Sequence, residues 1–489
     1  MRAQKLIEIL DGNGRCEVYG PTDFEVTGIT LDSRKIENGF LFAAIKGATS
    51  DGHSFIEMAV NKGASLILCT ELPHALDANV SYIKVENSAQ AFARVSQAFY
   101  DFPAEKLKVI GVTGTNGKTT VATLLFQLFT ELGYKCGLLS TVENKIGEEI
   151  VPATHTTPDA QGIAALMDRM VKAGCAYAFM EVSSHALDQE RVFGIPFKGA
   201  IFTNITHDHL DYHGTFLNYQ RAKRKFFDQL SSEAFTMINL DDRNGKSMYD
   251  HTKAKVKTYG LKSMADYRCK VLSNDTSGLH LWVDGKEVMM GMMGEFNAYN
   301  LLAVYGTAKE LGFESDQILQ ILSYLPGAEG RMQLVKSKNT KIVGIVDYAH
   351  TPDALENITE TLKKSKPTGS SLITVFGCGG DRDKTKRPEM GKIAAQKSDR
   401  VIITSDNPRS EDPDKIISEV FEGIPQELKN KVVAISDRSQ AIKTAVMIAK
   451  GSDVVLVAGK GHEKYQDIKG EKLPFEDKKV LEDALDSKA

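Results

Sequence analysis

The chain has 489 residues, of which 42% are hydrophobic and 25% are charged, as is usual for a globular protein of roughly two to four domains. A formal charge of −4 offers no basic surface to a polyanion, so we expect no nucleic-acid partner. No stretch approaches the roughly 18 apolar residues that a membrane-spanning helix needs, and residues 1–15 lack the apolar core of a signal peptide. Six scattered cysteines without a C-x-x-C pair argue against a zinc site or a disulfide framework, and predict a cytoplasmic protein.

The first hundred residues alternate short apolar runs with helical patterns. Strands are predicted over residues 40–45, 65–69 and 83–85. Helices are predicted over residues 53–62 and from the last of these strands to about residue 100. Asp101-Phe102-Pro103 is a predicted linker, because proline and the residue before it resist helix.

A second segment begins with an apolar strand over residues 107–112. A glycine-rich turn follows, and then a helix from about residue 119 to residue 132, which Gly133 ends. Further strands are predicted over residues 176–181, 199–203 and 235–239. Alternation of strands and helices predicts a mostly parallel sheet covered by helices.

The last third of the chain is the most regular. Five apolar strands are separated by helical segments, over residues 342–346, 372–376, 401–404, 432–435 and 454–457. Pro326-Gly327 breaks the preceding pattern. We therefore expect an α/β protein of three domains, at residues 1–104, 105–329 and 330–489.

A glycine-rich loop between the first strand and helix of the second segment predicts a site for a nucleoside triphosphate. The loop comprises Gly114, Thr115, Asn116, Gly117, Lys118, Thr119 and Thr120. Backbone N–H groups and a helix N-terminus attract phosphate, Lys118 can reach the β- and γ-phosphates, and the Thr119 hydroxyl is placed for Mg²⁺. The generic pattern expects its first glycine at Val112, where Gly111 and Gly114 flank the position instead. The alternative is an Asn-Gly turn that happens to contain a lysine.

Two polar clusters follow strands downstream of this loop. Glu181 ends a strand and is placed to bind Mg²⁺, although it could equally be a surface acid that caps the next helix. Residues 203–213 contain three histidines and two aspartates, a density that suits a hard cation and its phosphate ligands. Spacing alone makes Lys223 an ordinary solvated lysine.

Polar loops follow four strands of the last domain, at residues 347–350, 377–383, 406–409 and 459–463. In an open parallel sheet, ligands bind beyond the carboxyl ends of the strands. Arg382 and Arg409 suit carboxylates, whereas Asp406 and Glu463 suit an ammonium group. This combination predicts a zwitterionic amino acid as substrate.

Together these stretches resemble the Mur ligases, in the family's order, from Asp32-Ser33-Arg34 to the loop at 459–463. The stretches are 114–120, 181–187, 203–214, Gly294-x-x-Asn297-x-x-Asn300, Gly330-Arg331, 347–352 and 406–409. The displaced glycine of the phosphate loop is typical of this family. One departure is Gln333, where the family pattern leads us to expect glutamate. The resemblance implies a central P-loop-type ATPase domain between a small α/β N-terminal domain and a Rossmann-like C-terminal domain.

The resemblance also implies roles for individual residues. Lys118, Glu181, His209 and Lys223 would be catalytic, and Thr119, Glu181, His209 and Lys223 would hold Mg²⁺, with Lys223 carbamylated. ATP would contact the loop at 114–120 together with Asn300, Arg331 and Asp347. The UDP-linked substrate would contact Ser33, Thr156, Thr157, Ser183, Gln189 and Arg191. Diaminopimelate would contact Arg382, Asp406, Asn407, Pro408, Arg409, Gly459 and Glu463.

The implied reaction is ATP-dependent addition of meso-2,6-diaminopimelate to the D-glutamate γ-carboxylate of UDP-N-acetylmuramoyl-L-Ala-D-Glu, in peptidoglycan precursor synthesis. Arg409 would select this substrate, because relatives that add lysine usually lack the arginine. Losing such a pair would cost ~2–4 kcal/mol, or roughly 30- to 1000-fold. The alternatives are a lysine-adding relative, a folylpolyglutamate synthase-like ligase and, from another class, a nucleotide-gated switch. The protein is expected to be a monomer.

Overall fold

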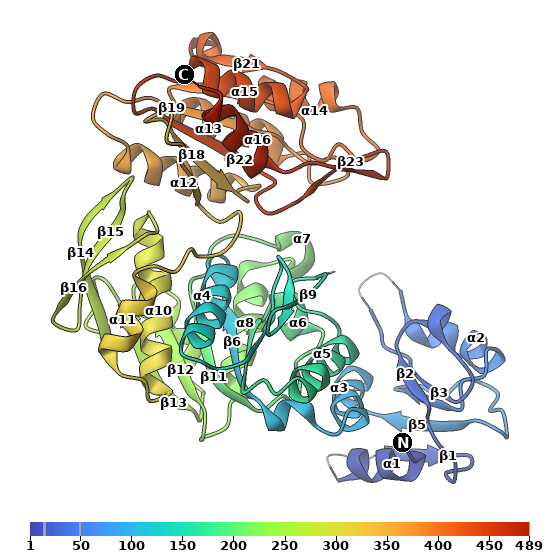
Figure 1. Ribbon diagram of the computed structural model, residues 1–489. Coiled ribbons are helices and arrows are strands. Elements are labelled where there is room, and N and C mark those ends of the chain that lie inside the picture. Colours follow the sequence, from blue (N-terminus) through green and yellow to red (C-terminus); the bar gives the residue numbers. More distant parts are fainter. Residues whose placement is uncertain (13–15, 48–49, 154, 489) are drawn as a thin grey trace. The chain divides into compact units, whose positions relative to one another are not determined.

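The computed structural model describes residues 1–12, 16–47, 50–153 and 155–488 (Figure 1). The chain separates into two compact units. The first unit comprises Met1–Tyr267 and Gly306–Gly312, and the second comprises Arg268–Tyr305 and Phe313–Ala489. Among the described residues no helix is both long and apolar enough to cross a membrane. All six cysteines are free.

The N-terminal part of the first unit is a five-stranded sheet in the order β1-β5-β4-β3-β2. Its strands are β1 (Cys16–Tyr19), β2 (Gly28–Thr30), β3 (Phe40–Ala43), β4 (Leu66–Cys69) and β5 (Ser81–Val85). Its helices are α1 (Ala3–Asp11), η1 (Ser33–Lys35), η2 (Gly52–Phe55), α2 (Ile56–Asn61) and α3 (Ser88–Phe99). Only β1 runs antiparallel to its neighbour. Two apolar clusters cover the two faces, so the small sheet has its own core.

The rest of the first unit contains strands in the order β13-β12-β11-β6-β10-β7-β8-β9. They are β6 (Lys108–Thr113), β7 (Cys136–Leu139), β8 (Asn144–Ile146), β9 (Glu149–Val151), β10 (Tyr177–Glu181), β11 (Phe197–Phe202), β12 (Phe235–Asn239) and β13 (Lys255–Gly260). The helices are η3 (Pro103–Lys106), α4 (Lys118–Glu131), α5 (Ala160–Lys172), α6 (Ser184–Asp188), α7 (Leu210–His213), α8 (Phe216–Asp228) and α9 (Gly245–Tyr249). From β13 to β7 the strands are parallel. The carboxyl ends of β6, β10 and β11 therefore meet at one edge.

The second unit contains nearly all of the antiparallel strands β14 (Tyr267–Asp275), β15 (Gly278–Val283) and β16 (Lys286–Met290). It also contains α11 (Ser315–Leu322) and α10 (Glu295–Glu310) as far as Tyr305. A six-stranded sheet follows in the order β17-β18-β22-β19-β20-β21. Its strands are β17 (Gln333–Val335), β18 (Val343–Asp347), β19 (Leu372–Phe376), β20 (Arg400–Ile403), β21 (Val432–Ala434) and β22 (Val454–Ala458). The helices are α12 (Pro352–Ser365), α13 (Lys386–Lys397), α14 (Pro413–Glu422), η4 (Gln426–Lys431), α15 (Arg438–Ile448) and α16 (Asp477–Asp486). A separate hairpin joins β23 (Tyr465–Ile468) to β24 (Glu471–Pro474).

This second sheet is parallel except for β17 and has a core on each face. All five strands predicted in the last third of the chain are present, within a residue or two of their expected ends. Sequence reasoning missed β14–β16. Buried and exposed residues are interspersed along them, and their apolar runs are short, such as residues 281–283 and 288–290.

Candidate active site

The predicted phosphate loop lies between β6 and the first turn of α4. Gly114 and Gly117 have φ of +153° and +91°, which favours glycine. A Cβ at Gly114 would also lie 1.9 Å from Thr203 Oγ1. Lys118 Nζ donates to the carbonyls of Gly114 (2.9 Å) and Thr115 (2.8 Å). The loop therefore curves around an amine at a helix N-terminus, the arrangement that binds anions.

Glu181 is completely buried at the end of β10, which excludes the interpretation as a surface acid. Its carboxylate accepts hydrogen bonds from Thr119 Oγ1 (3.0 Å) and from Thr141 N (2.7 Å). The next helix, α6, is capped by Ser183 instead, whose Oγ accepts from Ala186 N at 3.2 Å. The structure thus brings together two of the four predicted metal ligands.

Lys223 lies on α8 and is only 1% exposed, so the prediction from spacing of a solvated lysine is wrong. Its Nζ donates to Gly114 O at 2.7 Å and lies 4.7 Å from the centre of the Tyr219 ring. Burial, and then the charge of Lys118, lower the pKa of Lys223 well below its usual value. A lower pKa raises the fraction of neutral amine, which is the form that reacts with carbon dioxide to give a carbamate.

Histidines from two segments meet beside α7. The ring centres of His185 and His209 are 4.8 Å apart, and those of His185 and His213 are 5.7 Å apart. Burial lowers the pKa of all three, that of His185 to about 4, and Lys118 and Lys223 add to the effect on His209. His207 instead packs against the Phe216 ring. Within the described ranges no group of three or more His, Cys, Asp or Glu side chains is arranged to hold a metal.

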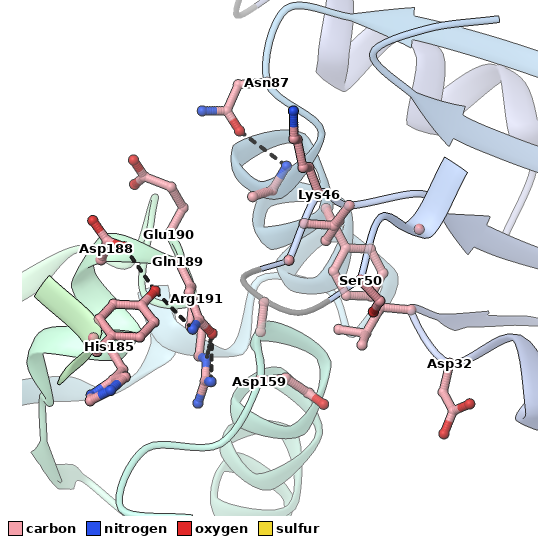
Figure 2. A pocket seen from close by; sticks show the side chains of 18 of the residues that line it. Asp32, Lys46, Ser50, Asn87, Asp159, His185, Asp188, Gln189, Glu190 and Arg191 are labelled. Carbon is pink, nitrogen blue, oxygen red and sulfur yellow. Dashed lines mark hydrogen bonds between the residues drawn. The ribbon is translucent and has the colours of Figure 1, made fainter. Parts of the chain in front are cut away.

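A cavity of about 1810 Å³ lies in the first unit. Figure 2 shows its lining from two sources: Asp32, Lys46 and Ser50 from the N-terminal part, and residues including Gln189 and Arg191 from the segment after β10. Three of the residues predicted to bind the UDP-linked substrate line it, namely Ser33, Gln189 and Arg191. The structure adds cationic residues that sequence reasoning missed, among them Lys46, Arg221 and Lys225.

The other three predicted substrate residues do not line this cavity, and of these only Thr157 is hydrogen-bonded to Arg191 and to Glu181. Arg191 donates to Gln189 Oε1 (2.6 and 3.0 Å) and to Thr157 O (2.8 Å). Thr157 Oγ1 in turn donates to Glu181 O at 2.7 Å and lies 3.4 Å from Ser183 Oγ. Thr156 Oγ1 accepts from Thr141 Oγ1 at 3.1 Å, and Thr141 N binds Glu181. Hydrogen bonds therefore link Arg191 in the cavity to the backbone carbonyl of Glu181, the residue that supplies the buried carboxylate.

In the second unit, the loops after β20 and β22 meet around a buried lysine. Lys460 Nζ donates to Asn407 Oδ1 (2.8 Å) and to Glu463 Oε2 (3.1 Å), and is inaccessible to solvent. Asn407 Nδ2 also donates to Glu463 Oε2 at 2.7 Å. Sequence reasoning named Asn407 and Glu463 but not Lys460, because spacing cannot distinguish a buried lysine in a Gly-Lys-Gly loop from an exposed one.

The remaining predicted amino-acid residues lie on the same loops. Gly459 has a φ of +115°, and a Cβ there would lie 2.6 Å from Asp406 Oδ2. Arg409 is half-buried, has a φ of +50°, and donates from NH1 to Gly380 O at 2.7 Å. Pro408 is buried, and Arg382 is exposed on the loop after β19. Parallel strand ends thus bring together the polar loops that the sequence separates.

The predicted nucleotide residues outside the phosphate loop also lie in the second unit. Asn300 is buried on α10 and donates to Asn297 Oδ1 at 3.0 Å. The Arg331 guanidinium lies 4.6 Å from the centre of the Tyr348 ring. Asp347 accepts from Met332 N (2.6 Å) and Ala349 N (2.8 Å), and burial raises its pKa. Gln333 Oε1 accepts from Gly330 N at 3.0 Å, a bond that the expected glutamate would also make.

Three family models match the chain in order: "Mur ligase family, catalytic domain" at residues 25–100, "Mur ligase middle domain" at 112–308 and "Mur ligase, glutamate ligase domain" at 330–461. The chain belongs to the Mur ligase family, as its motifs predicted. The predicted three-domain α/β fold is also confirmed, with a mixed, mostly parallel central sheet. The boundaries at residues 104 and 329 stay a prediction.

Relatives of high identity cover nearly the whole chain. A protein of Cytophaga hutchinsonii named UDP-N-acetylmuramoyl-L-alanyl-D-glutamate–2,6-diaminopimelate ligase is 51% identical over 96% of both chains. A protein of Phocaeicola vulgatus with the same name is 50% identical over 98% of this chain and 99% of that one. A solved structure under the same name has a TM-score of 0.70 and 33% identity, and covers 100% of this chain and 99% of that chain.

Proposed function

We propose that this protein is an ATP-dependent ligase that adds meso-2,6-diaminopimelate to UDP-N-acetylmuramoyl-L-Ala-D-Glu in peptidoglycan precursor synthesis. The observation that carries the proposal is the identity of 51% over 96% of both chains with a relative named for that reaction. The two sites described above supply the chemistry it requires, a phosphate loop in one unit and paired acidic and basic loops in the other.

Some of the predicted metal-binding residues of this chain are suitable ligands for Mg²⁺. Mg²⁺ prefers oxygen ligands, keeps several waters, and needs only one or two protein groups beside substrate phosphates. Thr119 Oγ1 and the Glu181 carboxylate, 3.0 Å apart, are such groups. Lys223 would become an oxygen donor only as a carbamate, and His209 would complete the set. Mg²⁺, when bound, would neutralise charge on the transferring phosphoryl group.

The reaction proceeds in two steps. The D-glutamate γ-carboxylate attacks the γ-phosphorus of ATP, and the bond from this phosphorus to the β,γ-bridging oxygen breaks. ADP leaves, and the carboxylate becomes an acyl phosphate. Lys118 stabilises the charge on the transferring group. The unprotonated amine of diaminopimelate then attacks the acyl carbon, and a tetrahedral intermediate collapses with loss of inorganic phosphate and a proton.

The UDP-linked substrate occupies the cavity of the first unit. Ser33 contacts the uridine nucleotide, whereas Thr156, Thr157, Ser183, Gln189 and Arg191 hold the muramoyl dipeptide. The hydrogen bonds from Arg191 through Thr157 to the backbone carbonyl of Glu181 support this assignment, because they join the cavity to the residue whose carboxylate lies beside the phosphate loop. Asn300, Arg331 and Asp347 contact the nucleotide of ATP.

Diaminopimelate binds at the strand ends of the second unit. Arg382 and Arg409 recognise carboxylates, with Asp406, Asn407, Pro408, Gly459 and Glu463 completing the site. Glu463 Oε2 accepts hydrogen bonds from both Lys460 and Asn407, so Oε1 remains to accept one from the substrate's ammonium group. Lys460 limits the negative charge that Asp406 and Glu463 place together.

A lysine-adding ligase is the second candidate within the family, and Arg409 argues against it because lysine has no second carboxylate. A folylpolyglutamate synthase-like ligase is less well supported, because residues 25–100 match a Mur ligase model and form a sheet of their own. Phosphate release with the UDP-linked dipeptide and either diaminopimelate or lysine tests the proposal. Phosphate release with lysine but not with diaminopimelate would overturn the proposal. The monomeric state and cytoplasmic location stay predictions.

A further inference from the structure

Within the described residues, the two largest fully buried side chains are both arginines, Arg387 and Arg438. Neither has a role in the proposed function, yet both lie in the second unit and are hydrogen-bonded to segments next to proposed substrate residues. Arg438 pairs with buried Asp477 and donates to the carbonyl of Ala458. Arg387 is more informative, because it is hydrogen-bonded to the loops after β19 and β20 at once.

Arg387 lies in the first turn of α13 and its side chain is 0% exposed. NH1 donates to Glu411 Oε2 (3.0 Å) and to Glu419 Oε2 (2.6 Å). NH2 donates to Glu411 Oε1 (2.9 Å) and to Gly379 O (3.1 Å). The hydrogen bonds from Arg387 hold the pKa of Glu411 well below its usual range. A planar guanidinium that is bound through both NH1 and NH2 has one orientation, so it fixes the separation of the groups that it binds.

The two loops are joined above this arginine by further bonds. Glu411 Oε1 accepts from Asp381 N at 2.6 Å. Gly380 N donates to Asn407 O at 2.9 Å, and Gly380 O accepts from Arg409 NH1 at 2.7 Å. The backbone that carries Arg382 is therefore bonded directly to the side chain and backbone that present Arg409.

This junction also holds two residues in a conformation that they seldom adopt. Asp381 has a φ of +53° and Arg409 a φ of +50°. Ser410 Oγ donates to Asp381 Oδ1 at 2.6 Å, which links the two left-handed turns. A Cβ at Gly380 would lie 1.9 Å from Pro408 O, so the loops approach as closely as backbone allows. Such conformations persist where the surroundings over-determine them.

We propose that Arg387 is a positioning residue for substrate selection. By binding Glu411 and Gly379 together, it sets the separation between the loops that carry Arg382 and Arg409. That separation decides whether both guanidinium groups meet the carboxylates of one diaminopimelate molecule. The inference rests on the proposed function and deepens it, because it assigns selectivity to a residue that touches no substrate.

A purely structural role would produce a different result. If Arg387 only attached α13 to Glu419 of α14, its loss would lower thermal stability and affect every substrate alike. A positioning role raises the KM for diaminopimelate and leaves the KM values for ATP and the UDP-linked dipeptide unchanged. The KM pattern thus separates the two roles.

The test compares wild-type protein with Arg387→Lys, which keeps the charge but loses the fork. Lys397→Met is the matched control, since Lys397 lies at the far end of the same helix and pairs with Glu356 and Glu360. Because misplacement by about 1 Å can cost ~100-fold, we expect the KM for diaminopimelate to rise roughly 10- to 100-fold in Arg387→Lys. Preference for diaminopimelate over lysine should fall by a similar factor, and Lys397→Met should show neither change.

Thermal melts establish that each variant is folded. If Arg387→Lys does not fold, Glu411→Gln carries the test, because the arginine keeps its bond to Glu419. A folded variant with the wild-type KM and wild-type preference overturns the positioning role and leaves the proposed function intact. Wild-type protein that releases no phosphate with diaminopimelate overturns the proposed function, and the inference falls with it. Hydrogen exchange at residues 379–382 should also quicken in the variant.

Discussion

Replacement of Arg409 by methionine removes the guanidinium proposed to select diaminopimelate. Arg409 uses NH1 for Gly380 O, whereas its Nε and NH2 donate no hydrogen bond to the described part of the chain. Two nitrogens of the guanidinium therefore remain to donate to a substrate carboxylate. A hydrogen bond to a charged group contributes ~1.5–3 kcal/mol. Because the Arg409 side chain is only half-buried, solvent screens its interaction with the substrate carboxylate. We therefore expect this interaction to contribute ~2–3 kcal/mol in total, which corresponds to roughly a 30- to 150-fold change in kcat/KM.

The assay is initial-rate phosphate release with diaminopimelate or lysine, from which kcat/KM is obtained for each. The diaminopimelate-to-lysine ratio should fall roughly 30- to 150-fold in Arg409→Met, with the loss confined to diaminopimelate. Arg400→Met is the control, since Arg400 is exposed at the start of the same strand, β20, and away from the loop. An unchanged ratio, or equal losses with both substrates, would refute the assignment of Arg409 as the selector.

Three further predictions concern the first unit. Lys118→Ala should abolish ATP turnover while calorimetry shows unchanged affinity for the UDP-linked dipeptide, and normal turnover would contradict the phosphate-loop assignment. Lys223→Ala should nearly abolish ligation, with partial recovery when short carboxylic acids replace the missing carbamate; full activity without them would exclude that role. Burial lowers the pKa of His185 from 6.5 to about 4, so the unfolded chain binds more protons between these values and stability falls as pH drops through them. Thermal melts at several pH values should show a shallower acid-side loss in His185→Gln, by up to ~1.4 kcal/mol per pH unit, and an equal loss would rule out His185 as the cause.

Much of the architecture could be predicted from the sequence, because it follows from local pattern. Buried parallel strands appear as short apolar runs, so residues 235–239 and 372–376 were predicted with the ends that β12 and β19 have. The phosphate loop was equally readable, since Gly114 and Gly117 occupy positions where a side chain clashes or the backbone is left-handed. The half-exposed hairpin of β15 and β16 was not predicted, because its mixture of buried and exposed residues resembles the sequence of a loop.

The family and the motifs were thus determined by the sequence alone, since glycine positions, apolar periodicity and the order of polar loops are properties of short segments. Burial of individual polar groups was decided only by the tertiary structure. Lys223 and Arg387 look like surface residues in the sequence, but both are inaccessible in the fold. The reason is physical: whether a charge is desolvated depends on what packs against it from distant segments, such as Gly114 against Lys223 and Glu411 against Arg387.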